Sequence, residues 1–147
     1  MRAFLDAHVL FSAANRDRSD LLVFFDLARA SLLELTTSAF AVEEAPRNIA
    51  LKRPERAAHC ARLIAELVLA PKPSTEHIAI AQATGLPPKD TPILAAALAA
   101  EADLLITGDR THFGPLFGRT IGRLTVHRPT DAPSTILRHA RRISGGR

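Results

Sequence analysis

Three aspartates stand where the sequence predicts a strand to end or a helix to begin. Asp6 follows the apolar run 3–5, and Asp109 follows the run 104–107 after a single glycine. Asp90 precedes a segment that favours a helix, with a proline in the first turn, where its missing N–H is tolerated. Each residue alone has a structural interpretation: Asp6 ends a strand, Asp90 caps a helix and Asp109 forms a turn. Together they indicate chemistry.

Carboxylates gathered at one place repel one another unless a cation neutralises them or their pKa values rise. Hard divalent cations such as Mg²⁺ and Mn²⁺ bind carboxylate oxygens and keep positions for water and for substrate phosphate oxygens. Such a cation lowers the pKa of a coordinated water and stabilises the charge on a leaving oxygen. The pattern therefore favours metal-dependent cleavage of a phosphodiester, with no nucleophile from the protein.

Strands and helices must alternate along the chain if the aspartates are to meet. Short apolar runs predict strands at 3–5, 33–37, 67–69, 104–107 and 124–127. Helices are predicted at 19–30, 38–51, 54–68, 75–84 and 90–102. This order is typical of βαβ units and predicts an α/β fold, a three-layer α/β/α sandwich with a mostly parallel central sheet. Ligands bind such sheets beyond the carboxyl ends of the strands, where Asp6 and Asp109 stand.

Composition indicates one cytoplasmic domain. The chain has 147 residues, of which 47% are hydrophobic, enough for one substantial core. We expect residues 1–128 to form the α/β domain and 129–147 to add a C-terminal helix and a frayed basic tail, from 144 onward. Cys60 is the only cysteine, which excludes an intrachain disulfide and favours a reducing cytoplasm. The longest uncharged apolar run, 93–100, is too short to span a bilayer, so we expect no membrane anchor.

Charge gives a weaker indication of the partner. The formal net charge is +4, which favours a polyanion such as nucleic acid. The basic residues gather in two places, which fit either phosphate contacts or solvated helix faces. They are Arg47, Lys52, Arg53, Arg56 and Arg62 in mid-chain, and Arg138, Arg141 and Arg142 near the C-terminus.

The sequence resembles the PIN domain family over roughly residues 1–128. Three stretches carry the resemblance in the family's order and spacing: residues 4–10 (FLDAHVL), 90–97 (DTPILAAA) and 102–113 (ADLLITGDRTHF). The resemblance implies that Asp6 is the family's first acid. It also implies that Asp90 is the acid at a helix start and Asp109 the acid that follows a strand.

The family's second acid lies on a helix after the second strand, where Glu43 and Glu44 compete. We prefer Glu44, because it directly precedes the small apolar Ala45, as in the family pattern. Glu44 would complete a set of four acids that serve as catalytic residues and metal ligands. Thr107, which begins the Thr-Gly-Asp turn, is a candidate auxiliary residue. Asp103 precedes its strand, at the opposite edge of the sheet, and is excluded.

The resemblance implies a function. PIN domains are typically Mg²⁺- or Mn²⁺-dependent ribonucleases, so it implies a metal-dependent endoribonuclease. Many small bacterial members are VapC-like toxins held inactive by a cognate antitoxin, and dimers are common. It therefore also implies a toxin of a toxin-antitoxin pair, an antitoxin partner and a homodimer. The spacing of the acids does not separate RNA from DNA, because the 2′-hydroxyl contact that distinguishes them cannot be read from one sequence.

The sequence departs from the family pattern at His8, where the family usually has asparagine. The imidazole could pack at the start of the first helix, favour a softer ion such as Mn²⁺, or signal lost activity. Pro46 lacks an N–H, so we expect its helix to kink or to begin late, which would change the direction of Glu44. His112, three residues after Asp109, either assists metal or phosphate binding or is a surface or partly packed histidine.

Candidate RNA contacts are few. Arg110 lies beside the proposed metal site, and Arg47 and Arg53 lie near Glu44, so these cations could contact phosphates. The apolar run 21–27 fits either the core or a protein interface. All seven aromatic residues are phenylalanine, and we expect most of them to pack in the core. The candidates for stacking on bases are Phe11, Phe113 and Phe117.

Two other functions compete with the ribonuclease. A phosphatase of the haloacid dehalogenase type also begins with a strand-terminal aspartate, but it needs a second aspartate where this chain has His8. That absence disfavours the phosphatase. The second alternative is a catalytically decayed PIN-like module that binds RNA or protein without cleavage.

Overall fold

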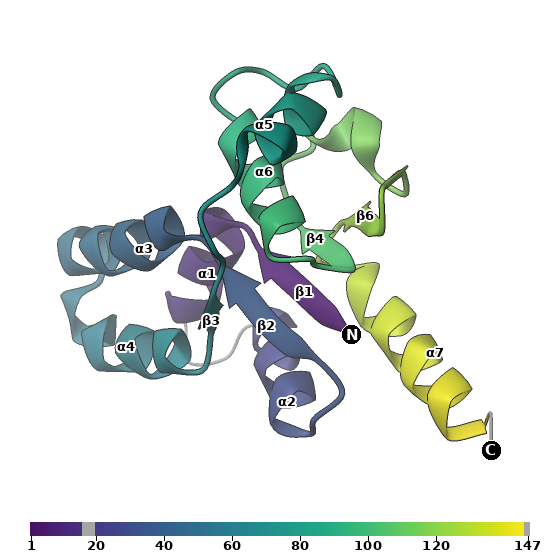
Figure 1. Ribbon diagram of the computed structural model, residues 1–147. Helices are drawn as coiled ribbons and strands as arrows, with labels where there is room; N and C mark the ends of the chain where they lie inside the picture. Colours follow the sequence, from purple (N-terminus) through teal and green to yellow (C-terminus); the bar gives the residue numbers. More distant parts are fainter. Residues whose placement is uncertain (16–19, 146–147) are drawn as a thin grey trace.

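The structure is a computed structural model that describes residues 1–15 and 20–145 (Figure 1). The strands are β1 (Arg2–Leu5), β2 (Glu34–Thr37), β3 (Val68–Leu69), β4 (Leu104–Ile106), β5 (Thr120–Ile121) and β6 (Leu124–His127). The α-helices are α1 (Ala7–Ala14), α2 (Val23–Arg29), α3 (Ala39–Lys52), α4 (Ala57–Ala65), α5 (Thr75–Gln82), α6 (Thr91–Ala99) and α7 (Ala132–Gly145). Three short 3-10 helices are η1 (Asp20–Leu22), η2 (Pro54–Arg56) and η3 (Gly114–Leu116). Among these residues, none of the helices combines the length and apolarity needed to cross a bilayer.

A six-stranded sheet forms the middle layer, in the order β3-β2-β1-β4-β6-β5. Every pairing is parallel except that of β5 with β6, which is antiparallel. In the register of β1 and β4, Leu5 lies opposite Ile106, and the Asp6 N–H donates to the Ile106 carbonyl at 3.1 Å. The carboxyl ends of these neighbouring strands therefore meet at one edge, with Asp6 and Thr107 side by side.

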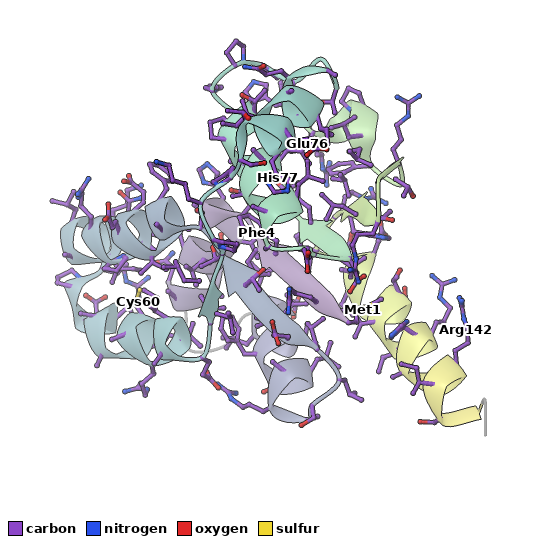
Figure 2. All side chains as sticks on the ribbon, viewed as in Figure 1. Met1, Phe4, Cys60, Glu76, His77 and Arg142 are labelled. Carbon is purple, nitrogen blue, oxygen red and sulfur yellow. The ribbon has the colours of Figure 1, made fainter. Side chains whose placement is uncertain are left out.

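Helices cover both faces of the sheet, because successive strand residues point to opposite sides. Ala3 and Leu5 pack into a cluster with the buried residues of α1 to α4, whereas Phe4 packs with those of α5 and α6. Figure 1 shows the two groups of helices on opposite sides of β1, and Figure 2 places the labelled Phe4 near the centre of the molecule. The predicted three-layer sandwich with a mostly parallel sheet is confirmed. Phe24 and Phe25 are both at most 1% exposed, so the apolar run 21–27 places its aromatic rings in the core.

Helix α7 begins in the core and ends outside it. Ala132 and Ile136 are fully buried in the cluster on the α1 side of the sheet. The rest of α7 extends away from the body, with Arg142 near its end (Figures 1 and 2). Helix α7 includes Ser144 and Gly145, the first two residues of the tail that we expect to fray. Arginine is a good helix former, so the last exposed turns are helical without packing. Residues 146–147 lie outside the described part.

Three elements, α1, η3 and β5, lie outside the segments predicted from pattern. α1 has eight residues, of which only His8 and Ser12 are polar, η3 has three residues, and β5 has two residues before the turn at Gly122. The predicted helix 54–68 divides into η2 and α4 and ends at Ala65, because β3 begins at Val68. The predicted helix 19–30 corresponds to η1 and α2, and its first residue, Ser19, lies outside the described residues.

Helix α3 passes through Pro46. It begins at Ala39, immediately after the cap Ser38, and continues to Lys52. The late start that we considered for this helix is therefore wrong. Ala41, Ala45 and Ile49 on one side of α3 are at most 1% exposed, so burial of this face offsets the backbone hydrogen bond that a proline cannot donate.

Candidate active site

The Asp6 side chain is held by Thr107, directly after β4, and not by the helix α1 that Asp6 precedes. It precedes α1, and its carbonyl accepts the Val9 and Leu10 N–H groups, but its side chain makes no capping hydrogen bond. The carboxylate instead accepts the hydroxyl of Thr107, from Oγ1 to Oδ2 at 2.8 Å. Asp6 is 3% exposed and Thr107 is 0% exposed. The Thr107 Oγ1 also accepts the Asp109 backbone N–H at 3.2 Å. Thr107, predicted as an auxiliary residue, therefore links Asp6 and Asp109 through its hydroxyl group.

Asp90 occupies the N-cap position of α6 without capping it. Its side chain makes no hydrogen bond to the first turn, and Pro92 stands within that turn. Asp90 is 7% exposed, and its Oδ2 lies 3.0 Å from His112 Nδ1. This carboxylate therefore points across the sheet edge toward the loop that follows β4, and the simple N-cap interpretation does not account for it.

Asp109 makes a turn and faces the same cluster. Its Oδ1 accepts the His112 backbone N–H at 3.0 Å, and its Oδ2 lies 3.1 Å from His112 Nδ1. Burial raises the pKa of the Asp109 carboxyl, but the His112 backbone N–H, the His112 ring and the Thr111 backbone N–H together lower it more. The pKa of Asp109 therefore lies below its ordinary value of 3.8. The carboxylate is the favoured form at neutral pH.

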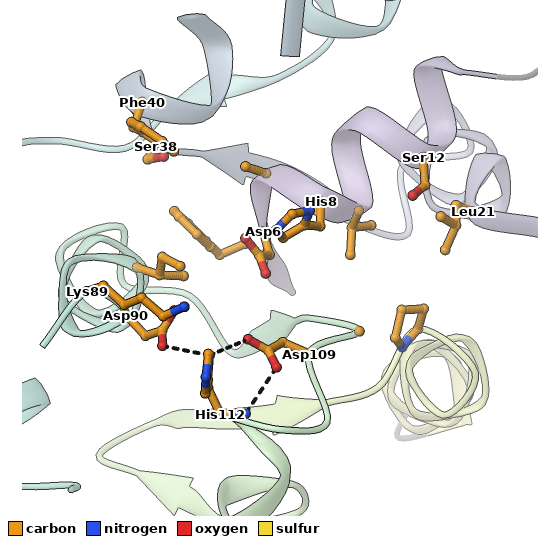
Figure 3. Close-up of a pocket in the computed structure, with 16 residues that line it drawn as sticks. Asp6, His8, Ser12, Leu21, Ser38, Phe40, Lys89, Asp90, Asp109 and His112 are labelled. Atoms are coloured by element: carbon orange, nitrogen blue, oxygen red, sulfur yellow. Dashed lines mark hydrogen bonds and ion pairs between the residues drawn. The ribbon is translucent and has the colours of Figure 1, made fainter. Parts of the chain in front are cut away.

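His112 stands between the two acids (Figure 3). One ligand atom from each of Asp90, Asp109 and His112 lies within 4.8 Å of the others, a separation that one metal ion could bridge. The Asp90 Oδ2 and His112 Nδ1 atoms are buried, and neither makes an aligned hydrogen bond within the described part of the chain. Two carboxylates and an imidazole suit a divalent cation, and the imidazole favours Mn²⁺ over Mg²⁺. The donor set therefore fits a metal ion, which would satisfy both buried atoms.

A cavity of about 610 Å³ opens over these residues. Asp6, Asp90, Asp109 and His112 all line it, although Asp6 is outside the group of three that could share one ion. His8 also lines the cavity from the first turn of α1, where it is exposed. Figure 3 shows Asp6 and His8 on one side and the Asp90, Asp109 and His112 group on the other. The structure thus brings three of the four predicted acids to one pocket.

The fourth predicted acid does not line this cavity. Glu44 lies on α3 with its side chain 32% exposed and its Oε2 3.6 Å from Arg47 Nη1. Glu43 is exposed and Glu44 is half-buried, and neither lines the cavity, so the choice of Glu44 over Glu43 stays a prediction. Helix α3 contributes Ser38 and Phe40 to the cavity from its N-terminal end, whereas Glu44 stands one turn further along.

The arginines proposed for RNA binding lie away from the cavity lining. Arg47 faces Glu44, and Arg53 donates from Nε to Glu55 Oε1 at 2.6 Å. Arg110 is exposed directly after Asp109. Among the described residues, the basic side chain of Lys89 lines the cavity; sequence reasoning missed it although it adjoins Asp90.

The aromatic residues proposed for stacking are not at this cavity either. Phe113 is 0% exposed, so that proposal is wrong, because η3 and β6 enclose the ring in the core. Phe11 packs against the core beneath Lys52, whose Nζ lies 5.3 Å from the ring centroid. Phe117 lines a different cavity, beside β6 and α7. Two phenylalanines line the acidic cavity: Phe4, which is 1% exposed and belongs to the core, and Phe40, which is 63% exposed and which no pattern in the sequence distinguishes from a core residue.

The contacts of Asp103 agree with its exclusion from the site. It accepts the Arg2 backbone N–H at 2.8 Å and the Arg123 guanidinium at 3.0 Å, at the amino ends of β1 and β4. Burial raises its pKa, and these two donors lower it more, so the net shift is downward. Asp103 is thus a structural acid with a lowered pKa, distant from the carboxyl edge.

Comparison with known proteins gives a family and a fold. A family model described as "PIN domain" matches residues 2–111. The search of curated proteins finds no significant match. Among solved structures, DNA-bound VapBC from Salmonella typhimurium is 14% identical with a TM-score of 0.64, covering 88% of this chain and 98% of that one.

Two further solved structures are similar. VapBC2 from Rickettsia felis, bound to a DNA fragment from its promoter, is 16% identical with a TM-score of 0.62 and covers 87% of this chain and 98% of that one. FitAcB from Neisseria gonorrhoeae is 18% identical with a TM-score of 0.55 and covers 88% of this chain and 99% of that one. At these identities the likeness establishes the fold.

Proposed function

Because the chain belongs to the PIN domain family, a family of nucleases, we propose that it is a metal-dependent endoribonuclease that hydrolyses RNA phosphodiester bonds. The observation that carries the proposal is the convergence of Asp6, Asp90, Asp109 and His112 on one cavity. Three of these four were expected from the order of strands and helices alone. Their donor atoms match the ligand preference of Mg²⁺ or Mn²⁺.

Each residue has a defined task in this proposal. Asp90, Asp109 and His112 hold the cation, and Asp6, fixed by Thr107, faces the same cavity as a further ligand or as a partner for a coordinated water. When bound, the cation would activate water and stabilise charge on the phosphate oxygens. The carboxylate of Asp109 is ready for this task at neutral pH, because its pKa is lowered.

The remaining predicted residues act around this centre. We propose Glu44 as the fourth acid, which would act from α3 on ions or water that extend beyond the cavity lining. Lys89, together with Arg110, Arg47 and Arg53, would attract RNA phosphates in a salt-dependent manner. His8 would contact bound RNA or a second ion from the first turn of α1.

We also propose the biological setting implied by the family. Two of the similar structures are VapBC complexes and a third is FitAcB. A cognate antitoxin, a homodimer, a cytoplasmic location and action as the toxin of a toxin-antitoxin pair are therefore proposed for this chain. Induction of the chain with and without a small co-transcribed neighbour tests this: the proposal expects growth arrest that the neighbour relieves, and unaffected growth in both cases would refute it.

Cleavage of a labelled RNA panel tests the enzymatic activity. The wild type is compared with Asp6→Asn, Asp90→Asn and Asp109→Asn in Mg²⁺, in Mn²⁺ and in EDTA, with single-stranded DNA of the same sequence alongside. We expect metal-dependent cutting of RNA that each substitution abolishes. Asp103→Asn is the matched control, since it removes a partly buried acid with a lowered pKa at the opposite edge of the sheet.

The outcome also separates the nuclease from the binding module. If the wild type binds RNA but cuts nothing in either metal, the decayed PIN-like module replaces the nuclease. If residual cutting is the same in wild type and in all acid variants, a contaminant is responsible and the assignment fails.

A further inference from the structure

Phe40 is exposed where an aromatic side chain would ordinarily be buried. Its side chain is 63% exposed, whereas Phe4, Phe24, Phe25 and Phe113 are at most 1% exposed. A phenylalanine buried in a core or an interface contributes about 1.5–3 kcal/mol relative to an exposed one, so this position gives up packing energy in the free chain. Such a residue at a cavity indicates a contact that forms on binding.

The first turn of α3 fixes the position of Phe40. The Ser38 Oγ accepts the Ala41 N–H at 3.1 Å, so the helix begins rigidly at Ala39. Ala41, Ala45 and Ile49 form the buried side of α3, which leaves Phe40 outside the core. Phe40 therefore faces solvent because of the helical period.

Phe40 lies on the wall of the acidic cavity. It and Ser38 line the cavity from α3, while Lys89, Asp90 and Ile93 line it from the start of α6. Figure 3 shows Phe40 and Ser38 on one side of the cavity, and Lys89 with Asp90 on the other, with Asp6 between Phe40 and Asp109. The exposed ring and the proposed metal ligands thus share one cavity.

We propose that Phe40 stacks on a nucleobase of single-stranded RNA next to the phosphate that is cut. This role rests on the proposed ribonuclease function and adds a subsite to it. A base is one sugar away from its phosphate, so a phosphate held by a cation at the carboxylates would bring a neighbouring base to the cavity wall. Lys89 lines the cavity across from Phe40, so it would contact the RNA backbone beside the stacked base.

Stacking requires an unpaired base, since both faces of a paired base are covered in a duplex. It is tolerant of base identity, because every base has an aromatic face. The subsite therefore favours single-stranded loops and ends over duplex RNA and adds little sequence preference. Among the described residues, Phe40 is the one phenylalanine that is strongly exposed.

The test measures binding and stacking separately from cleavage. The ligand is a fluorescent RNA oligonucleotide that the wild type cuts, with 2-aminopurine at the positions flanking the cleavage site in turn. It is bound by the Asp109→Asn variant in Mg²⁺, so that binding is observed without turnover. We expect quenching of 2-aminopurine at one position, lost in Phe40→Ala and Phe40→Leu but retained in Phe40→Trp, which preserves stacking.

Affinity gives the second measurement. We expect Phe40→Ala to weaken binding about 5- to 150-fold, the range found on removing one stacked aromatic residue. An abasic site at the quenched position should weaken binding of the RNA to the parent, the Asp109→Asn variant, by a similar factor. In the variant that also carries Phe40→Ala, the abasic site should not weaken binding further, because both changes remove the same contact. Leu51→Ala is the matched control: Leu51 is a 78% exposed apolar residue on the same helix that does not line the cavity.

The outcomes distinguish this role from the proposed function. If wild type binds and cuts RNA while Phe40→Ala is equally quenched and equally tight, only the stacking role is refuted. The stacking role alone is also refuted if Phe40→Leu shows the quenching and the affinity of the parent variant. If Phe40→Ala changes only the sedimentation of the protein, the stacking role is refuted and the ring belongs to a protein interface. If the wild type does not cut RNA and neither it nor the Asp109→Asn variant binds RNA, the stacking role and the ribonuclease proposal are refuted together.

Discussion

Thr107→Val tests whether one buried hydroxyl organises the acidic site. The substitution keeps the shape of the side chain and removes Oγ1, which donates to Asp6 Oδ2 at 2.8 Å and accepts the Asp109 N–H at 3.2 Å. A hydrogen bond to a charged group contributes about 1.5–3 kcal/mol, and a neutral one about 0.5–1.5 kcal/mol. Because Thr107 is 0% exposed, water does not replace either bond directly. We therefore expect the free energy of unfolding to fall by about 2–4 kcal/mol.

A matched control isolates the charged partner. Thr36 is also a buried strand threonine, 2% exposed, and its Oγ1 donates to the Ala3 carbonyl at 3.2 Å, a neutral acceptor distant from the acids. Thr36→Val should lower the free energy of unfolding by about 0.5–1.5 kcal/mol. For a chain of this size the two variants should lower Tm by roughly 5–15 °C and roughly 1–5 °C, respectively.

Function should separate the two variants further. A residue that orients metal ligands typically costs about 10–100-fold in metal affinity or activity when it is removed. We expect this loss for Thr107→Val in Mn²⁺ titrations and in RNA cleavage, and wild-type values for Thr36→Val. Calorimetry in EDTA gives stability, and isothermal titration with Mn²⁺ gives affinity. Equal Tm shifts with unchanged Mn²⁺ affinity in both variants would refute the idea that Thr107 positions Asp6.

Four further predictions follow from burial, charge and metal linkage. Mn²⁺ at a hundred times its dissociation constant should stabilise the wild type by about 2.7 kcal/mol, and calorimetry should show no such gain in Asp90→Asn. Glu44→Gln should reduce kcat by about 10–100-fold while cation binding to the main cluster persists; wild-type kinetics would remove Glu44 from the site. The pKa of Asp109 is lowered, so its interactions stabilise the fold above its ordinary value of 3.8 and are lost as pH falls through the lowered value. In EDTA, wild type should therefore lose more free energy of unfolding than Asp109→Asn between about pH 5 and pH 2 in urea titrations, and equal losses would contradict this. Burial raises the pKa of the Cys60 thiol, which is 1% exposed, so an aromatic disulfide reagent should label it only as fast as the chain opens; immediate labelling of the native protein would contradict its burial.

The fold follows from features that short stretches of sequence contain. Short apolar runs, two of which are followed by an aspartate, alternate with helical segments, which leaves a parallel sheet with right-handed crossovers as the expected arrangement. The same features place Asp6 and Asp109 at the carboxyl edge and Asp103 at the other edge, because strand direction decides which end of a run faces which way. β5 and α1 escaped prediction, since two residues make no periodic pattern and a helix of eight residues with two polar positions gives only a weak one.

The sequence by itself determined the sandwich fold and the ends of elements at which the three aspartates stand. The position of each aspartate depends only on the element that it follows or precedes and on the direction of the chain. The tertiary structure decided what surrounds them. His112 lies between Asp90 and Asp109 because α6 and the loop after β4 converge. Phe40 lines the cavity that they share, whereas Glu44 does not. Such positions depend on how separate elements pack side by side. The distance between side chains on different elements cannot be read from their spacing along the chain.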